Sequence, residues 1–473
     1  MHRGWRRLPC SVTGVLALCA CGVAWGQIEI NSSPNVVGSG ARALGMGGAF
    51  IAVADDATAA SWNPGGLTQL ERPELSVVYS WKWFGEEFSS TPLIFPEDDY
   101  QVSTKGLNYF SIVYPFQRTL AGRNFVVSLN YQSKFDFDRS FDFRARDSVV
   151  FRSLNSVAGR NMVIGFDQEG SLASLSPAFG FELTDRLSCG VVMNLWDSSL
   201  LPENKWESKT KRRVNLRLTG LLNAMALGRL DTYENYDNFE GTNYTFGVLY
   251  KPTQRLSVGA VYHTRFAARV DYERLDVGHN PFSVALSDSR LRLEFPSAFG
   301  VGAAYRFPND KLTVSLDVTR REWDEFIQID PGAGVFEHRI SPITGLPKSM
   351  SPHDPTYTVR LGAEYVFVNP TKPVQKFLPS LRAGIFYDPE PASGRKAEWW
   401  GIKRGDGKVD DYYGITLGGG VLIKNRVNID AMYEYRWGDG VRSDTLAGAG
   451  KFERGFDIDS GQHAVYLSTV VYF

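Results

Sequence analysis

One short motif near the N-terminus combines two side chains with specific backbone chemistry. Proline fixes its own backbone angle, and asparagine can hydrogen-bond to backbone groups that a distorted strand leaves free. Asn63 and Pro64, followed by Gly65, therefore predict a device that holds or gates irregular backbone. The plainer alternative is that Asn-Pro forms a simple turn.

Three charged residues precede this motif in the sequence. Buried charges need partners, so Arg42 is predicted to pair with Asp55 and Asp56 in a confined interior and to tie this part of the chain to its surroundings. The alternative reading is that the two aspartates cap a short helix.

Many charged residues stand on the polar side of segments in which apolar and polar residues alternate. Arg265, Arg306, Arg321 and Arg360 are the candidates for binding an acidic head group, because a guanidinium fork fits a carboxylate. The alternative is that the charges form a structural network with one another. The charged positions predicted to face inward are Lys82, Lys134, Asp136, Glu182, Lys251, His263, Arg265, Arg306, Asp317, Arg321, Arg360, Glu364, Arg382, Asp430, Glu434 and Arg436.

Metal and enzyme chemistry find little support. The histidines past residue 26 show no spacing such as HExxH. The run GDGKVDD at 405–411 lacks the register and the bidentate Glu of an EF-hand loop. We therefore expect no metal, no cofactor and no enzymatic activity, although a hydrolase whose Ser and His meet only in space stays open.

The alternation itself predicts the fold. The chain ends in HAVYLSTVVYF, where every second residue from Val465 to Phe473 is apolar or small, and ELSVVYSWKWF and RVNIDAMYEYRW repeat the pattern. Successive side chains of a strand point to opposite faces, so one face can meet lipid while the other meets a polar lumen. Together with 13% aromatic residues and 46 Gly, this indicates an all-β transmembrane antiparallel barrel.

About fourteen strands are expected, an even number. Tight connections alternate with long polar ones near 138–170, 198–241, 266–295, 322–355 and 437–461, as when turns face the periplasm and loops extend outside. Pro177 predicts a bulge or an edge-like break. The predicted segments are 74–84, 106–116, 123–137, 171–183, 186–197, 242–251, 254–265, 296–307, 311–321, 356–368, 379–388, 412–423, 426–436 and 462–473.

Two stretches precede the barrel at 74–473. Residues 1–26 have the basic start and short apolar core of a secretory signal peptide; the rival reading is a lipoprotein leader with Cys21 lipidated. Residues 27–73 are rich in Gly and Ala without alternation, and are predicted to fill the lumen as a hatch. Only Cys189 remains after cleavage at 26, which excludes an intramolecular disulfide.

The hatch resembles the N-terminal segment of the FadL family of outer-membrane long-chain fatty-acid transporters. FPSAFGVGAAYRF, NYTFGVLYKPTQRLSVGAVYHTRF and RAGIFYDPEP are similar to hairpins of that family. Gly65 departs from the family's usual alanine. The matching hatch positions are Ser39, Gly40, Arg42, Ala43, Gly48, Ala54, Asp55, Asp56, Ala57, Asn63, Pro64 and Leu67.

The resemblance implies a bacterial outer-membrane channel that takes up long-chain fatty acids or other hydrophobic molecules through a lumenal pocket, with a lateral exit beside the Asn63–Pro64 motif. The same superfamily includes barrels with structural or secretion-linked roles, which remain the alternative. The expected partners are a hydrophobic small molecule such as a fatty acid, outer-membrane lipid, and the barrel-assembly machinery, which would read the C-terminal strand ending at Phe473. The net charge of -1 argues against nucleic acid.

Overall fold

Fourteen strands close into one antiparallel ring in the computed structural model, which describes residues 36–473 except 91–93, 96–99, 121, 152–155, 220–223, 280–281, 309, 331–337, 344–346, 370–374, 392–408 and 446–454. The ring closes where β1 pairs with β21, from Glu74↔Tyr472 onward. In ring order the strands are β1 (Glu74–Ser90), β3 (Tyr100–Leu120), β4 (Arg123–Asp136), β6 (Ser156–Thr184), β7 (Leu187–Asp197), β9 (Ala224–Tyr250), β10 (Leu256–His263), β13 (Ala298–Arg306), β14 (Leu312–Arg321), β17 (Thr356–Val366), β18 (Phe377–Tyr387), β19 (Tyr413–Ile423), β20 (Val427–Thr445) and β21 (Gly455–Tyr472).

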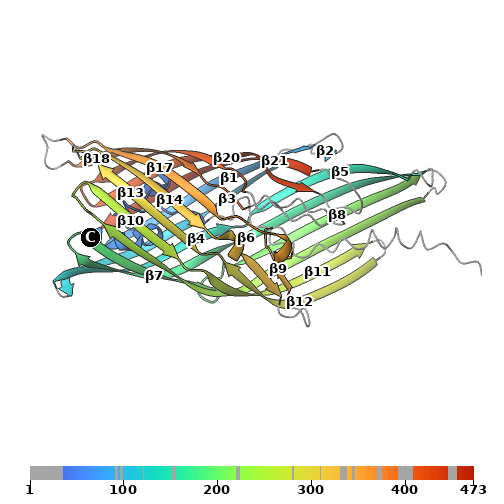
Figure 1. The fold of residues 1–473 in the computed structure, drawn as a ribbon, viewed down its shortest axis with the longest axis horizontal. Coiled ribbons are helices and arrows are strands. Elements are labelled where there is room, and N and C mark those ends of the chain that lie inside the picture. Colours follow the sequence, from blue (N-terminus) through green and yellow to red (C-terminus); the bar gives the residue numbers. More distant parts are fainter. Residues whose placement is uncertain are drawn as a thin grey trace, which may run out of the picture.

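Each predicted barrel segment coincides with one of these strands, so the fold prediction is confirmed. The short connections gather at one end, where the C-terminus also lies (Figure 1). There the backbone N–H of Phe473 donates to the carbonyl of Pro73 at 3.0 Å. Within the described ranges, no helix has the length and apolar character needed to cross a membrane.

The long connections differ from the prediction, because much of each is strand rather than loop. Strands β5, β6, β8, β9, β11 and β12 pair in sequence and continue the wall beyond the barrel as an open, curved sheet, which we call the extension (Figure 1). Two short 3-10 turns, η3 (Trp323–Glu325) and η4 (Lys348–Met350), lie in the same connections. The added strands are β2 (Ile94–Phe95), β5 (Arg139–Phe151), β8 (Lys205–Thr219), β11 (Phe266–His279), β12 (Phe282–Phe295), β15 (Ile327–Asp330) and β16 (His338–Ile340).

Pro177 interrupts pairing on one side only. It pairs with Leu129 of β4, but the ladder between β6 and β7 passes from Leu175↔Leu195 to Ala178↔Val192 without it. Proline has no N–H to donate, which accounts for a one-sided gap in an otherwise continuous strand.

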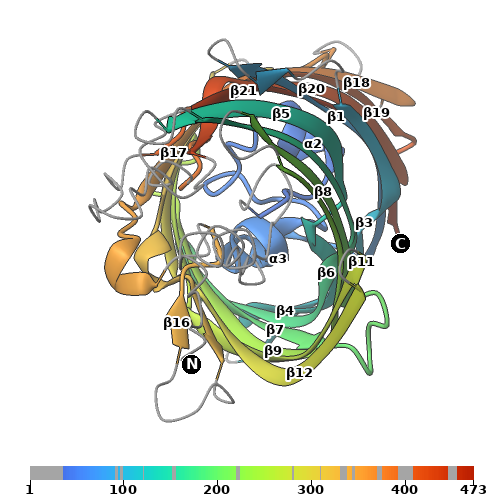
Figure 2. The ribbon, with the colours of Figure 1, turned by 90° about the vertical axis from the view of Figure 1, so that its right-hand side faces the viewer.

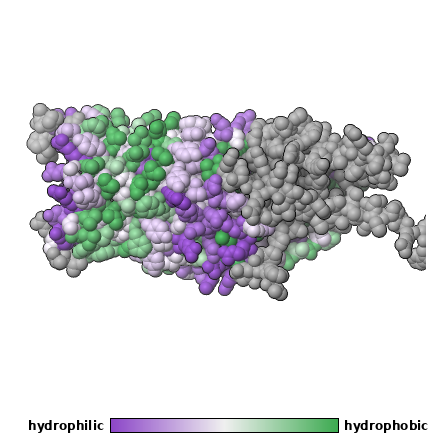
Figure 3. Space-filling model, viewed as in Figure 1, coloured by the Kyte–Doolittle hydropathy of each residue, from purple (hydrophilic) through white to green (hydrophobic). Residues whose placement is uncertain are grey.

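A belt of exposed apolar side chains crosses the visible face of the half of the molecule that holds the short turns (Figure 3). Leu381 of β18, Ile385 of β18 and Leu417 of β19 are 58%, 56% and 62% exposed, while their strand neighbours Arg382 and Thr416 are buried. This alternation gives the belt the composition expected of a barrel wall in contact with hydrocarbon.

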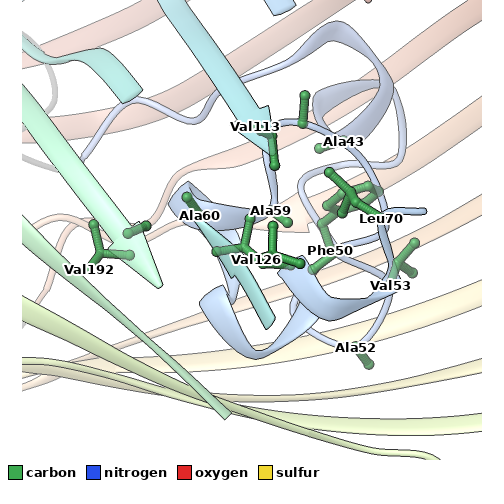
Figure 4. Close-up of a cluster of buried hydrophobic side chains, with 14 of the residues drawn as sticks. Ala43, Phe50, Ala52, Val53, Ala59, Ala60, Leu70, Val113, Val126 and Val192 are labelled. Atoms are coloured by element: carbon green, nitrogen blue, oxygen red, sulfur yellow. The ribbon is translucent and has the colours of Figure 1, made fainter. Parts of the chain in front are cut away.

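Residues 36–72, called the N-terminal segment below, lie inside the ring (Figure 2). The segment forms two short helices, α2 (Ala41–Gly45) and α3 (Ala59–Trp62), and the 3-10 helix η1 (Pro64–Gln69). Its alanines, Phe50 and Leu70 pack with Val113, Val126 and Val192 of the wall in one buried apolar cluster (Figure 4). The small side chains let three turns of backbone fit within the lumen.

Glycines of the wall make this fit possible. A Cβ at Gly190 would overlap the carbonyl of Pro64, and one at Gly362 would overlap the carbonyl of Met46. A Cβ at Gly384 would meet the backbone of Gly47, which itself has a φ of 65°. The wall therefore receives the segment as backbone against backbone, a contact that any larger residue would block.

Candidate functional site

A chain of ion pairs joins the N-terminal segment to the wall. Arg42 binds Glu364 of β17 through two parallel hydrogen bonds of 2.9 Å, and Arg382 of β18 binds the same carboxylate at 2.7 Å. On its other side Arg42 donates to Asp55 at 2.6 Å and to Asp56 at 3.3 Å. Burial alone would lower the pKa of Arg42, but the carboxylates of Asp55 and Glu364 raise it well above its ordinary value.

The geometry shows the ion-pair reading of the aspartates but not the capping reading, because α3 has Thr58 as its N-cap and no side-chain capping hydrogen bond. Asp56 also accepts from the backbone N–H and the hydroxyl of Thr58, at 2.8 and 2.6 Å, in the turn that precedes the helix. The partner that reaches the wall is Glu364, which the alternation placed in the lumen but did not pair with Arg42. What these pairs do for gating stays a prediction.

Asn63 holds three backbone groups at once. Its amide donates to the carbonyls of Ile51 (2.8 Å) and Val248 of β9 (3.0 Å), and its carbonyl accepts from Gly65 at 3.0 Å. A Cβ at Gly65 would press on the backbone of β9 at Leu249, so the position that departs from the family's alanine is also one of close approach. The motif is thus both a turn and a clamp on the wall.

The resemblance implies a lateral exit beside Asn63 and Pro64, but the two ladders of β9 next to Asn63 contain no gap. β9 pairs without interruption with β7 from Leu187↔Tyr250 to Asp197↔Glu240, and with β10 over the stretch next to Asn63. The clamp meets intact wall because glycines at 190, 247 and 259 make room for it without bending the strands.

A gap does occur between β3 and β4. Their ladder runs from Leu120↔Arg123 to Tyr109↔Gln132 and stops, while the outer part of β3 stays with β1 and residues 133–136 of β4 stay with β6. The start of the described chain fills the space: Val37 donates to the carbonyl of Lys134 at 3.0 Å. The carbonyl of Val37 accepts from Gln132 at 2.9 Å, and that of Gly38 accepts from Asn108 at 3.1 Å. No pattern in the sequence signalled this contact.

Farther out, one carboxylate bridges the same gap. Asp136 of β4 accepts from Lys82 of β1 at 3.2 Å and from Thr104 of β3 at 3.0 Å. Two polar contacts therefore span the parted strands where backbone ladder bonds are missing.

A cavity of about 230 Å³ lies between the N-terminal segment and the outer mouth of the barrel. The parted strands contribute to its lining through Thr104, Gln132 and Lys134, and the segment does so through residues 36–39 and Trp62. Toward the extension its walls are aromatic; these side chains are Phe135, Trp196, Phe266, Phe295, Trp323 and Phe326.

A row of polar side chains crosses the cavity wall on the inner side of these aromatics. Lys134 donates to Asn194 at 3.0 Å, Asn194 donates to Thr245 at 3.3 Å, and Thr245 lies 3.0 Å from Nδ1 of His263. His263 and Arg321 occupy the same register level, each paired with Ala298 of β13. We call Lys134 and Arg321, with the imidazole of His263 between them, the cationic row.

The row has no directly paired counter-charge; the carboxylate that acts on Arg321 from a distance is that of Asp388, which lines the same cavity. Lys134 and Arg321 lie over the rings of Trp196 and Trp323, at 5.4 and 5.5 Å, and neither forms an ion pair in the part of the chain that the structure describes. The other lumenal charges behave as a network, since Arg360 and Arg436 both reach Asp388. A cavity with unpaired cations and aromatic walls can hold an anion with an apolar body.

The four arginines proposed for head-group binding divide into two pairs. Arg321 and Arg360 line the cavity. Arg265 does not, because the two-residue break between β10 and β11 reverses the alternation and leaves its side chain exposed. Arg306 is exposed at the short-turn end of β13, where its N–H donates to Arg255. Alternation predicts that Lys134 and His263 face the lumen, but it does not predict that they lie beside Arg321. Only the register between strands brings the three residues together.

One acidic residue stands at the outer edge of the cavity, beyond the end of β4. Asp138 accepts from the backbone N–H of Gly170 at 3.0 Å. Burial, with the nearby charge of Asp136, raises the pKa of Asp138 to about 6. Among the described residues, no three His, Cys, Asp or Glu side chains group as a metal site would. The signal peptide and the rival lipidated Cys21 lie outside the described residues.

Comparison with known proteins gives the family. The sequence profile of the outer membrane protein transport protein family (OMPP1/FadL/TodX) matches residues 164–473. A crystal structure of a Pseudomonas aeruginosa FadL homologue is similar in fold, with 15% identity over 93% of this chain and 100% of that one and a TM-score of 0.64. The P. putida toluene transporter TodX has 13% identity over 92% and 99% of the two chains and a TM-score of 0.52. No curated protein sequence matches. The chain therefore belongs to the OMPP1/FadL/TodX family of outer-membrane transport proteins for hydrophobic compounds.

Proposed function

We propose that this protein takes up long-chain fatty acids, or amphipathic anions of the same shape, and releases them sideways into the membrane. The observation that carries the proposal is the cationic row beside aromatic walls. A carboxylate bound at Lys134 and Arg321 would leave its acyl chain along the aromatic side chains, which offer apolar area without competing donors. The lumen would then hold the head group near the N-terminal segment and the tail toward the outside.

The lateral exit is proposed for the parted strands β3 and β4. An apolar molecule leaving through the wall needs a break in the backbone ladder. The N–H and C=O groups freed at such a break need polar partners, because they cannot face hydrocarbon unpaired. Here Val37 and Gly38 occupy the break with hydrogen bonds that a shift of the N-terminal segment would release. We therefore propose that this segment acts as a hatch and that its first described residues close the exit.

The head-group proposal is tested by comparing two ligands. Lys134→Gln with Arg321→Gln removes both charges and keeps hydrogen-bonding capacity. A charge-assisted hydrogen bond contributes about 1.5–3 kcal/mol and a neutral one about half as much. Replacing two such bonds by neutral ones therefore costs about 1.5–3 kcal/mol in total, and we expect oleate affinity to fall by about 10- to 100-fold. Affinity for a neutral hydrocarbon of similar length should change by less than about threefold, because the aromatic wall is untouched.

Uptake of labelled oleate by cells gives the functional readout. The matched control is Arg186→Gln with Lys424→Gln, two exposed cations at the short-turn end. Asn63→Ala and deletion of residues 27–72 test the hatch in the same assay. Equal uptake by all variants and by cells without the protein would reject transport and favour the structural or secretion-linked alternative.

The exit proposal is tested by a reversible tether. In a Cys189→Ser background, cysteines at Val37 and Gln132 should join the segment to β4 when oxidised, since the backbone of Val37 lies in hydrogen-bond contact with that strand. Oxidised protein should still bind oleate but transport it at least tenfold more slowly, and reductant should restore transport. Unchanged transport with the disulfide formed would exclude this exit.

A further inference from the structure

The outer face of the extension divides into a basic strip and an apolar strip. Alternate residues of β8 point outward, and the distal ones include Lys211, Arg213 and Arg217. None of the three forms an ion pair with the part of the chain that the structure describes. Asp231, the carboxylate nearest to Lys211 across the ladder, is taken by Arg229 at 2.8 Å. The strip therefore presents uncompensated positive charge.

The apolar strip lies on β12, three strands away on the same face, with β9 and β11 between. Leu286 of β12 pairs with Leu275 of β11, which pairs with Tyr233 of β9, which pairs with Lys209 of β8. This register places all four side chains on one side of the sheet. On β12, Phe282, Val284 and Leu286 are 77%, 57% and 73% exposed.

This arrangement is costly unless something covers it. Exposed leucine and phenylalanine at alternate positions of a free strand form a contiguous apolar surface, which soluble surfaces normally avoid. These residues stand beyond the barrel, at the end away from the short turns, so the belt of membrane-facing residues does not explain them (Figure 1). Their exposure calls for a partner in the medium outside the cell.

Charge complementarity identifies the partner's chemistry. The basic strip selects negative charge, and the aliphatic strip beside it selects acyl chains. A nucleic acid would use the cations but offers nothing to Val284 and Leu286. We infer that the outer face of the extension is a docking surface for an anionic lipid bilayer, such as a vesicle or a neighbouring membrane, distinct from the lumenal cavity.

Vesicle flotation tests the inference with the full chain held in nanodiscs of neutral phosphatidylcholine. The probe is a vesicle of phosphatidylcholine with 30% phosphatidylglycerol, and the comparison is a vesicle of phosphatidylcholine alone. We expect binding at least tenfold stronger to the anionic vesicle, and weakening at 0.5 M salt because exposed charges are screened. Equal binding to both vesicles, or none, overturns the inference.

Two variants separate charge from apolar contact. Lys211→Gln with Arg213→Gln and Arg217→Gln should reduce anionic vesicle binding at least tenfold, and Phe282→Ser with Leu286→Ser should reduce it at least fivefold. If only the charge variant matters and heparin displaces the vesicles, the surface binds polyanions and the lipid inference fails. Two control variants should bind vesicles like the parent. Arg186→Gln with Arg255→Gln and Lys424→Gln removes the same number of charges from the short-turn end. Lys134→Gln with Arg321→Gln removes the cations of the lumenal cavity and so tests the lumen separately. Unboiled gel migration verifies the folded barrel in each variant.

Discussion

Cutting the ion-pair chain at Arg42 should loosen the N-terminal segment without unfolding the barrel. Arg42→Met keeps an unbranched apolar stem in place of the aliphatic part of the arginine and removes the fork that bonds Glu364 and Asp55. Removing one partner of a buried pair costs about 3–5 kcal/mol. Glu364 keeps its 2.7 Å bond to Arg382, so the lower value, about 3 kcal/mol, is the better expectation. Local opening of the segment would then become about 100-fold more frequent.

Hydrogen exchange by mass spectrometry in nanodiscs measures this directly. Peptides from residues 41–70 should exchange about 100-fold faster in Arg42→Met, while peptides from β18 and β19 keep their protection. Arg320→Met is the matched control, because Arg320 and Glu322 form an exposed pair whose loss costs about 0–1 kcal/mol. Exchange of the segment within threefold of the parent would refute the view that this chain of charges holds it.

Three further predictions concern the fit of the segment and the outer edge of the cavity. Gly190→Ala should destabilise the protein by about 1–3 kcal/mol, because the added Cβ would overlap Pro64. Gly419→Ala is the control and should leave the stability unchanged, because its Cβ would have no neighbouring atom closer than 3.5 Å. Thermal unfolding in detergent compares the two variants. Asn63→Ala should cost about 1–3 kcal/mol in the same assay, since it strands two buried carbonyls. The folded-state pKa of Asp138 is raised to about 6, so its contribution to stability falls as pH rises from about 4 through 6. The free energy of unfolding of Asp138→Asn should equal that of the parent at pH 4 and exceed it by about 1–2 kcal/mol at pH 7, after allowing for partial exposure. A difference that stays constant across this pH range would contradict the argument.

The barrel could be predicted from the sequence because lipid imposes a rule on every second residue. Strand β19 exposes Ile415 and Leu417 and buries Thr416, and the same contrast marks each membrane strand. The extension escapes that rule, since its strands lie beyond the membrane-facing belt. β8 reads KWESKTKRRVNLRLT, and a strand with so many charges is indistinguishable from a polar loop by alternation alone.

The site was predictable only as far as alternation continued without a break. Arg321 was assigned correctly to the lumen because β14 is regular up to that residue, whereas one irregular junction turned Arg265 outward. The cationic row depends on the stagger between strands, which brings together residues 134, 263 and 321. Stagger is fixed by the closure of the ring, and no single segment of sequence contains it.

The contacts between the barrel wall and the N-terminal segment determine how easily the segment could move. At Gly190, Gly362 and Gly384 the wall offers backbone and no side chain, so these contacts bury little apolar area. More than half of the buried residues in the apolar cluster around Phe50 belong to the segment itself, and these would move with it. What binds the segment to the wall is therefore mainly hydrogen bonds and the Arg42–Glu364 pair, whose partners water can replace when the segment shifts. A plug held by an interlocking apolar interface would lose that area on every opening. If the segment moves as proposed, polar attachment to a glycine-lined wall would let the lumen open at moderate cost.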